Sequence, residues 1–392
     1  MRAYSESNEE ALRARDLLKD WAGEGLLTQA QYQRMEQETV CELRRTNIFL
    51  RLVLYLFTLL IVGAAVALFF DVFVTRATVP KQGFFLIIFA AISYAAAELA
   101  VSRARLYRYG IEEALAACSV AFLYLGMQYV RPGGMAVLAP AAAAIVSLWI
   151  WRRFGLAYAF PAAMIFVLWL PDYWTPSYSA QHLIVAAFYA AGLIAVAAVR
   201  SQHRFTYLND GYSITEACLW LGIYLAINLQ LWSGSLLGYW WGDPRPGYQF
   251  SRPFYWTTWV LIWCLPPAVL ARGVRRKDRL VIAVGAIVAV LTLVTNKPYL
   301  GWQRHTWDPM LLGALLIAVA LFLSRWLAGS PGGIRHRFTA RRLSGKDKHW
   351  MNAAAAGLGV VLPDSITLSK TDRPDFRFGG GDSGGGGASS DF

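Results

Sequence analysis

Charge is scarce in this sequence. Of its 392 residues, 16% are charged and 56% are hydrophobic, whereas about 25% of the residues of a soluble domain are charged. The missing charge leaves long apolar runs. Residues 52–70, for example, are 19 residues without a charge, enough for a helix to cross roughly 30 Å of hydrocarbon. The runs do not alternate between apolar and polar residues, which argues against a transmembrane β-barrel and predicts an all-α membrane protein.

Cysteines and catalytic motifs are scarce as well. The four cysteines form no CxxC pair, and none has a histidine at metal-ligand spacing, so they are predicted to be small buried apolar side chains. The sequence contains no GxSxG, no HExxH, no Walker loop and no glycine-rich dinucleotide turn. We therefore expect no catalytic residue, no cofactor and no metal. The five histidines are scattered over loops and tail: His182, His203, His305, His336 and His349.

The N-terminal residues lack the features of a cleavable signal peptide. Glu6, Glu9 and Glu10 stand where such a peptide carries a basic region. We therefore expect the first apolar run to act as an uncleaved signal anchor.

The sequence instead contains ten apolar runs. Each is predicted to form a transmembrane helix, which gives a polytopic helix bundle of about ten spans. Whether the short fourth, fifth and ninth runs fully cross is left open. The predicted spans are residues 48–70, 83–101, 111–130, 135–151, 154–170, 183–199, 214–233, 254–271, 280–295 and 309–328.

The loops between these runs alternate between Arg-rich and Arg-poor. Loops on one side hold 12 Lys or Arg residues, and loops on the other side hold 7. The positive-inside rule assigns the first side, with both termini, to the cytoplasm. Topology and contact with anionic lipid at the cytoplasmic face thus explain the net charge of +12, and we expect no nucleic-acid partner.

Residues 1–45 are predicted to form a cytoplasmic helical hairpin. Residues 7–10 and 28–31 each fit a capping box, and Gly23 and Gly25 separate the two helices. The sequence between residues 28 and 60 has no Pro or Gly, so the second helix can continue into the first span.

The hairpin is too small to bury much core by itself. We expect it to pack on the membrane domain, on a protein partner or on a second copy of the chain. Trp21, Leu27 and Tyr32 are its candidate interaction surface.

The membrane domain, residues 46–328, is followed by a tail of residues 329–392. The tail is first basic and then rich in glycine, a composition that predicts disorder over most of its length. Residues 353–362 are apolar but too few to span a membrane.

The hairpin resembles that of a known group. Residues 18–21, Leu-Lys-Asp-Trp, and 25–32, Gly-Leu-Leu-Thr-Gln-Ala-Gln-Tyr, resemble predicted bacterial membrane proteins of the family called domain of unknown function 2157. Leu27-Thr28 and Ala30-Gln31 depart from the usual pattern of that family. The resemblance implies a hairpin ahead of many spans in the bacterial inner membrane, and it supplies no activity. The tail resembles the glycine-rich endings of several bacterial membrane-anchored protein groups.

Glu98 is the ionisable residue whose predicted position is the least favourable for a charge. Burying a charge in a span is costly unless the charge is paired. Glu98 lies near the C-terminus of the second span, where the helix dipole disfavours an anion. It therefore needs a cation such as Arg103 or Arg105, or a proton.

Three further polar residues are candidates for an ion pair or a polar pathway. Glu113 and Glu216 begin the third and seventh spans, where the helix dipole favours a carboxylate. Asn228 lies in the outer half of the seventh span, where hydrogen bonding between helices is the ordinary role of an amide.

Three functions remain open at this stage. The favoured one is a non-enzymatic component for interaction or assembly at the inner membrane, acting through the hairpin or tail. The alternative is a transporter or channel for a small solute or ion that uses the polar groups of spans two, three and seven. The third is a membrane enzyme on a lipid-linked substrate, and it would use outward residues: Asp172, His182, Asp243, His305 and Asp308.

Overall fold

The computed structural model of the protein is a set of helices with one short β-hairpin. It describes residues 3–23, 25–39, 41, 43–74, 78–130, 137–202, 209–232, 250–302, 305, 307–329, 334–335 and 338–339. The elements are α1 (Glu6–Gly23), α2 (Gln29–Glu38), α3 (Ile48–Phe69), η1 (Phe70–Val74), α4 (Val79–Ser102), α5 (Ile111–Val130), α6 (Leu138–Phe154), α7 (Ala159–Trp169), η2 (Pro171–Tyr173), α8 (Tyr178–Gln202), α9 (Asn209–Ile227), α10 (Leu229–Trp232), α12 (Arg252–Arg276), α13 (Arg279–Tyr299), α14 (Asp308–Ala328), β1 (Ile334–Arg335) and β2 (Phe338–Thr339).

The chain divides into two units, Met1–Trp326 and Leu327–Phe392. In the second unit the described strands β1 and β2 pair antiparallel. The glycine-rich part of the predicted tail lies outside the described residues.

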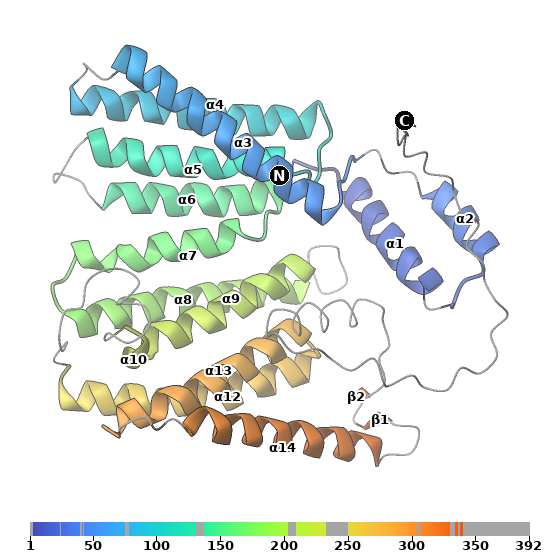
Figure 1. Ribbon diagram of the computed structural model, residues 1–392, viewed down its shortest axis with the longest axis vertical. Helices are drawn as coiled ribbons and strands as arrows, with labels where there is room; N and C mark the ends of the chain where they lie inside the picture. The colour runs from blue at the N-terminus through green and yellow to red at the C-terminus, as the bar shows by residue number, and fades with distance from the viewer. Residues whose placement is uncertain are drawn as a thin grey trace, which may run out of the picture. The chain divides into compact units, whose positions relative to one another are not determined.

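In the first unit, the helices from α4 onward lie roughly side by side, while α3 runs obliquely across α4 (Figure 1). Neighbours pack as hairpins, α4 with α5, α6 with α7, α8 with α9 and α12 with α13, while α9 also packs on α12 and α13. The C-terminal ends of α4, α6, α8 and α12 and the N-terminal ends of α5, α7, α9 and α13 therefore lie at one end, which we call the Arg-rich end. The described basic residues in or beside the turns at this end include Arg103, Arg105, Arg108, Arg152, Arg153, Arg200, Arg272, Arg275, Arg276, Lys277 and Arg279.

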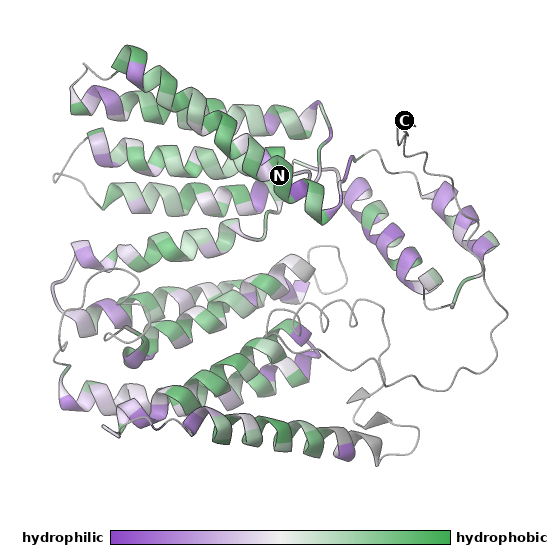
Figure 2. Ribbon diagram, in the orientation of Figure 1, coloured by the Kyte–Doolittle hydropathy of each residue, from purple (hydrophilic) through white to green (hydrophobic). Residues whose placement is uncertain are grey.

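Six described helices are long and apolar enough to cross a membrane: Ile48–Val74, Val79–Ser102, Ile111–Val130, Tyr178–Gln202, Arg252–Arg276 and Arg279–Tyr299. Apolar residues fill the middle of these helices, and hydrophilic residues gather toward the ends (Figure 2). The protein is thus an all-α, multi-pass membrane protein whose spans contact the lipid bilayer.

The predicted count of ten spans is not supported. A helix lies in each of the other four runs, but α6 has only 17 residues and ends on two arginines. Helix α7 has 11 residues, which reach about 17 Å, because Pro171 begins a new turn directly after it. The apolar segments of α9 and α14 are also short, namely Gly211–Ile227, which stops before Asn228, and Asp308–Leu323.

Two predictions about the N-terminal hairpin are also corrected. Helix α1 begins at Glu6, so Ser7 lies inside the helix and cannot cap it. Helix α2 ends at Glu38, and α3 begins separately because the side chain of Asn47 accepts a hydrogen bond from the backbone N–H of Leu50. The other capping box, formed by Thr28 and Gln31, is confirmed.

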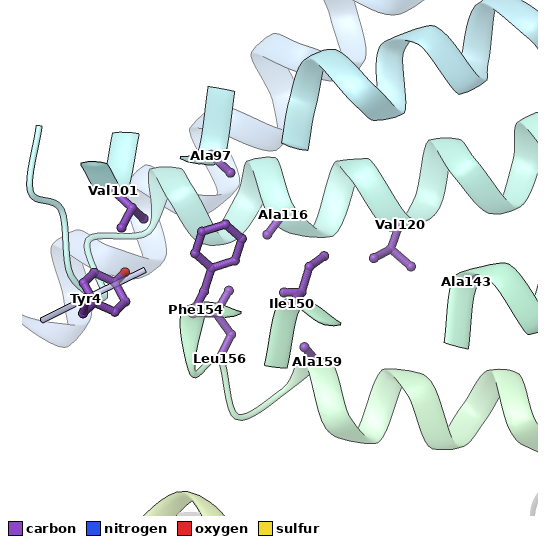
Figure 3. Close-up of a cluster of buried hydrophobic side chains, with 10 residues drawn as sticks. All are labelled: Tyr4, Ala97, Val101, Ala116, Val120, Ala143, Ile150, Phe154, Leu156 and Ala159. Atoms are coloured by element: carbon purple, nitrogen blue, oxygen red, sulfur yellow. The ribbon is translucent and has the colours of Figure 1, made fainter. Parts of the chain in front are cut away.

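A buried apolar cluster joins the N-terminal segment to the bundle (Figure 3). Tyr4 packs there with residues of α4, α5, α6 and the start of α7. The Tyr4 hydroxyl donates to the carbonyl of Leu106, 3.1 Å away, and the N–H of Ala3 donates to the carbonyl of Arg153 at 2.8 Å. These contacts fix the start of the hairpin at the Arg-rich end.

Helices α4 and α5 approach each other most closely at two glycines. A Cβ on Gly83 would lie 2.6 Å from the carbonyl oxygen of Gly126 and 2.6 Å from the backbone nitrogen of Val130. Small residues allow two backbones to approach in this way, which is a common means of packing spans.

Candidate functional site

A cluster of charged side chains surrounds Glu216 at the Arg-rich end. Arg200 of α8 donates to Glu216 of α9 at 2.7 Å and pairs with Asp278 at 2.6 Å. Arg272 and Arg276 of α12 donate to the carboxylate of Glu216 at 2.7 and 3.1 Å. The Glu216 cluster, defined by these five residues, therefore ties α8, α9 and α12 to the first turn of α13.

The inner part of the cluster is buried. The side chains of Glu216, Asp278 and Arg200 are 0%, 5% and 9% exposed. Removing ions from water costs several kcal/mol each unless their partners and hydrogen bonds are in place. Two carboxylates interleaved with three guanidinium groups supply those partners.

Asp278 has a second task as the N-cap of α13. One carboxylate oxygen accepts from the backbone N–H of Leu280 and Val281, and Ser213 of α9 donates its hydroxyl to the carboxylate at 2.7 and 2.8 Å. Burial alone would raise the pKa of Asp278, but the Ser213 hydrogen bond and the Arg200 ion pair outweigh burial. The pKa is therefore lowered below its ordinary value.

The outer part of the cluster reaches solvent. The side chains of Arg272 and Arg276 are 32% and 31% exposed. The cluster contains three cations and two anions, so its excess charge is positive and lies toward the exposed arginines. This arrangement suits contact with an anion and offers no general base, because both carboxylates are occupied by cations.

Glu113, the corresponding residue at the start of α5, also pairs with an arginine. Two nitrogens of Arg51 of α3 donate to the Glu113 carboxylate. The Tyr158 hydroxyl donates to the backbone carbonyl of Glu113 at 2.9 Å. The neighbouring Glu112 is buried and accepts from the N–H of Tyr109 at 2.7 Å, while its other oxygen has no partner. The pair with Arg51 attaches α3 to the bundle.

Glu98 lies near the end of α4 and forms its ion pair with Arg153 of α6. Arg103 and Arg105 lie in the turn after α4. Arg105 has a positive φ of 53°, and its carbonyl accepts from the N–H of Arg44 at 2.9 Å. The ion pair thus links two helices of the bundle, and the turn is held against the segment that precedes α3.

Asn228 separates α9 from α10 and is fully buried. Its amide donates to Tyr224 at 2.8 Å and to Thr295 of α13 at 3.0 Å. The backbone N–H of the next residue, Leu229, donates to the Tyr299 hydroxyl at 2.8 Å. Thr295 and Tyr299 of α13 therefore supply hydrogen-bond partners for polar groups at the break between α9 and α10.

The residues considered for an outward enzyme site are held by local contacts. The Nδ1 of His182 is 2.7 Å from the carbonyl of Ala226 and, since a carbonyl only accepts, it donates there. Asp308 pairs with Lys297 and accepts from the backbone N–H of His305. Asp243 lies outside the described residues. Among the described residues, no three His, Cys, Asp or Glu side chains gather into a metal-binding group.

The hairpin has an apolar surface outside the spans. Trp21 is exposed, while Leu27 and Tyr32 are partly buried. Leu17, one turn before Trp21, and Leu26 are exposed too, and the N–H of Leu26 donates to the carbonyl of Trp21 at 2.9 Å. Leu17 and Trp21 lie on the last turns of α1 and Leu26 lies in the turn that follows, and we call these three residues the hairpin patch.

The sequence pointed to the carboxylates but not to their partners. Arg51, Arg153, Arg200 and Arg272 belong to other helices, and in a sequence they look like ordinary flanking residues of spans. No protein-family model, no curated protein and no solved structure matches the chain. The resemblance of the hairpin to domain of unknown function 2157 therefore stays a prediction.

Proposed function

We propose that this membrane protein is a non-enzymatic interaction or assembly component of the bacterial inner membrane, with its Arg-rich end and both termini in the cytoplasm. The hairpin patch is the observation that carries the proposal. Leu17, Trp21 and Leu26 are 40%, 42% and 67% exposed on a segment that precedes the spans. Large apolar residues exposed together outside a membrane indicate a contact surface.

The way the hairpin is attached supports this role. Arg45 pairs with Asp16 of α1 at 3.0 Å, and Arg15 donates to the carbonyl of Thr39 at 2.8 Å. Together with the buried Tyr4, these contacts hold the hairpin in one position. A preorganised surface loses less entropy on binding than a loose one.

The charge of the hairpin indicates the chemistry of its partner. Residues 6–38 contain eight Asp or Glu and four Lys or Arg. A surface that is apolar and acidic is complementary to one that is apolar and basic, and it is repelled by anionic lipid. The partner that fits is a basic protein surface, from a second copy of the chain or from another protein.

The proposal is tested by crosslinking in intact cells. The variant Trp21→Ser/Leu26→Ser removes most of the hairpin patch, and Gln33→Ser/Gln37→Ser changes two exposed polar residues of α2 as a matched control. We expect the first variant to lose about tenfold or more of the crosslinked product, because a buried Trp often dominates an interface, and the control to retain it.

The mass of the product separates a second copy from another protein. Equal product from both variants, or unchanged product after deletion of residues 1–40, would contradict the proposed role. Membrane insertion of each variant, measured by extraction with detergent but not with alkali, shows that a loss of product is not a loss of inserted protein.

A transporter or channel for a small solute is the second candidate, and the interruption at Asn228 favours it. Broken helices mark binding sites in many transporters. Under this alternative, Asn228→Leu and Glu216→Gln change solute flux in liposomes. Flux that is equal to that of empty liposomes, with folded protein present, would rule it out for the solutes tested.

A further inference from the structure

We infer that the turn between α12 and α13 binds the headgroup of an anionic phospholipid. The turn, Arg275–Arg279, carries exposed Arg275, Lys277 and Arg279. Arg272 and Arg276, each about one-third exposed, lie beside it in the last turns of α12. The inference is independent of the hairpin and its proposed partner.

The charge balance favours an anion. The turn and the Glu216 cluster together contain six cations: Arg200, Arg272, Arg275, Arg276, Lys277 and Arg279. The carboxylates of Glu216 and Asp278 are buried, whereas the side chains of Arg275 and Lys277 are exposed. The exposed side is therefore basic, and phosphate is the anion that a fork of guanidinium donors binds best.

The arginines at the rim are held in place for this contact. Arg272 uses its Nε to donate to Glu216, while a guanidinium has five N–H donors in a planar fork. Glu216 thus fixes the direction of the side chain, which remains 32% exposed. Less side-chain entropy is lost when such a group meets a ligand.

Exposed apolar residues flank the cations of the turn and indicate lipid rather than a soluble anion. Val274 and Leu280 are 46% and 40% exposed, one on each side of the turn. They end and begin two helices that are apolar enough to span a membrane. A phospholipid presents phosphate beside hydrocarbon. Its phosphate would meet the cations of the turn, and its acyl chains would meet Val274 and Leu280.

The backbone of the turn supports a functional role for Lys277. This residue caps α12 in the left-handed region, with φ 56° and ψ 36°, where glycine is the ordinary choice. The turn is tight, because a Cβ on Gly273 would lie 2.9 Å from the backbone nitrogen of Ile282. A strained lysine at this position is consistent with a task for its ammonium group.

The test measures lipid binding by the full chain in nanodiscs. Wild type is placed in phosphatidylcholine alone and in phosphatidylcholine with phosphatidylglycerol, and retained phosphatidylglycerol is counted by native mass spectrometry. We expect Arg275→Gln/Lys277→Gln to retain about tenfold less, since each basic residue near the surface strengthens binding severalfold. The control Lys19→Gln/Arg34→Gln removes two exposed cations of the hairpin and should retain as much as wild type.

A second variant separates binding from folding. Lys277→Gly relieves the left-handed strain, so it should raise the melting temperature in pure phosphatidylcholine and still lower retention of phosphatidylglycerol. Retention equal to wild type in both turn variants would overturn the inference. Inorganic phosphate that stabilises wild type in phosphatidylcholine as much as phosphatidylglycerol does would also overturn it, in favour of a soluble anion.

Discussion

Three arginines from two helices donate to one carboxylate that has no exposed surface, that of Glu216. Such a group contributes little net stability relative to an apolar residue, but removing one member leaves the others buried without a counter-ion. The role of Glu216 is therefore to fix the relative positions of α8, α9 and α12.

The substitution Glu216→Gln tests that role. It keeps the shape of the side chain and removes its charge, so Arg200 loses one of its two carboxylate partners. We expect a loss of about 3 kcal/mol in the free energy of unfolding, at the lower end of the range for a buried pair because Arg272 and Arg276 are partly exposed. Glu38→Gln, in the exposed pair with Arg34, is the control and should leave unfolding in detergent unchanged. Similar values for both variants would contradict the structural role.

The pH dependence of stability tests Asp278. Because its pKa is lower in the folded chain than in the unfolded chain, the folded state gains stability from this carboxylate above its ordinary pKa of about 3.9. That contribution is lost as the pH falls below this value toward the folded pKa. The difference in melting temperature between wild type and Asp278→Asn should therefore be constant from about pH 7 to 5 and shrink toward pH 3. A constant difference over the whole range would be contrary evidence.

At the scale of elements, helix pairs are held by close backbone contact as well as by charge. Helices α4 and α5 meet at Gly83 and Gly126, and α6 joins α4 through Glu98 and Arg153. Helix α3 is attached differently, since most of its apolar side chains are exposed and its ion pair with Glu113 lies near one end. The middle of α3 therefore faces lipid.

The substitution Gly83→Ala tests the contact between α4 and α5. Its Cβ would meet two backbone atoms at 2.6 Å, so the helices must move apart. We expect a loss of about 1–3 kcal/mol in the free energy of unfolding, typical of overpacking. Gly63→Ala in α3 is the matched control, because a Cβ there meets nothing within 4 Å and alanine favours a helix. A loss in the control as large as in Gly83→Ala would show that the close approach is not the cause.

At the scale of the whole first unit, Tyr4 is one of the links between the hairpin and the bundle. Its ring packs edge-on against Tyr107 with centroids 4.9 Å apart, in addition to the hydrogen bond to Leu106. The position of the hairpin patch therefore depends on Tyr4, which precedes α1.

Tyr4→Ala should release this link, and Tyr4→Phe should weaken it only by the value of one hydrogen bond, about 1 kcal/mol. We expect amide hydrogen exchange of residues 103–110 to accelerate roughly tenfold or more in Tyr4→Ala, because local opening becomes easier. Tyr32→Ala on α2 should leave exchange in that turn unchanged. Equal protection in Tyr4→Ala and wild type would mean that the segment is held by its other contacts.

The sequence was sufficient for the positions of the helices but not for the number of spans. Long apolar runs predict helices wherever they occur, and a helix lies in each of the ten runs. The span count depended on local details that hydropathy averages away, such as the Pro171 turn that follows α7 and the break at Asn228.

The ion pairs could be predicted only in part, for a geometric reason. Glu98, Glu113 and Glu216 are conspicuous as ionisable residues in or beside apolar runs. Their partners lie 55, 62 and 56 residues away in Arg153, Arg51 and Arg272. Which arginine meets which carboxylate is decided by how helices rotate and stack, and hydropathy carries no information about that.

The contacts of the N-terminal segment also have a consequence for synthesis. Ala3 donates to the carbonyl of Arg153 and Tyr4 to that of Leu106, so this segment docks on residues that are translated after it. At about 5–20 residues per second, the interval is roughly 5–20 s for Leu106 and roughly 8–30 s for Arg153. During that time the apolar ring of Tyr4 has no binding site within the chain. Docking of this segment can therefore be completed only after α6 has been made, which makes it a late step of folding.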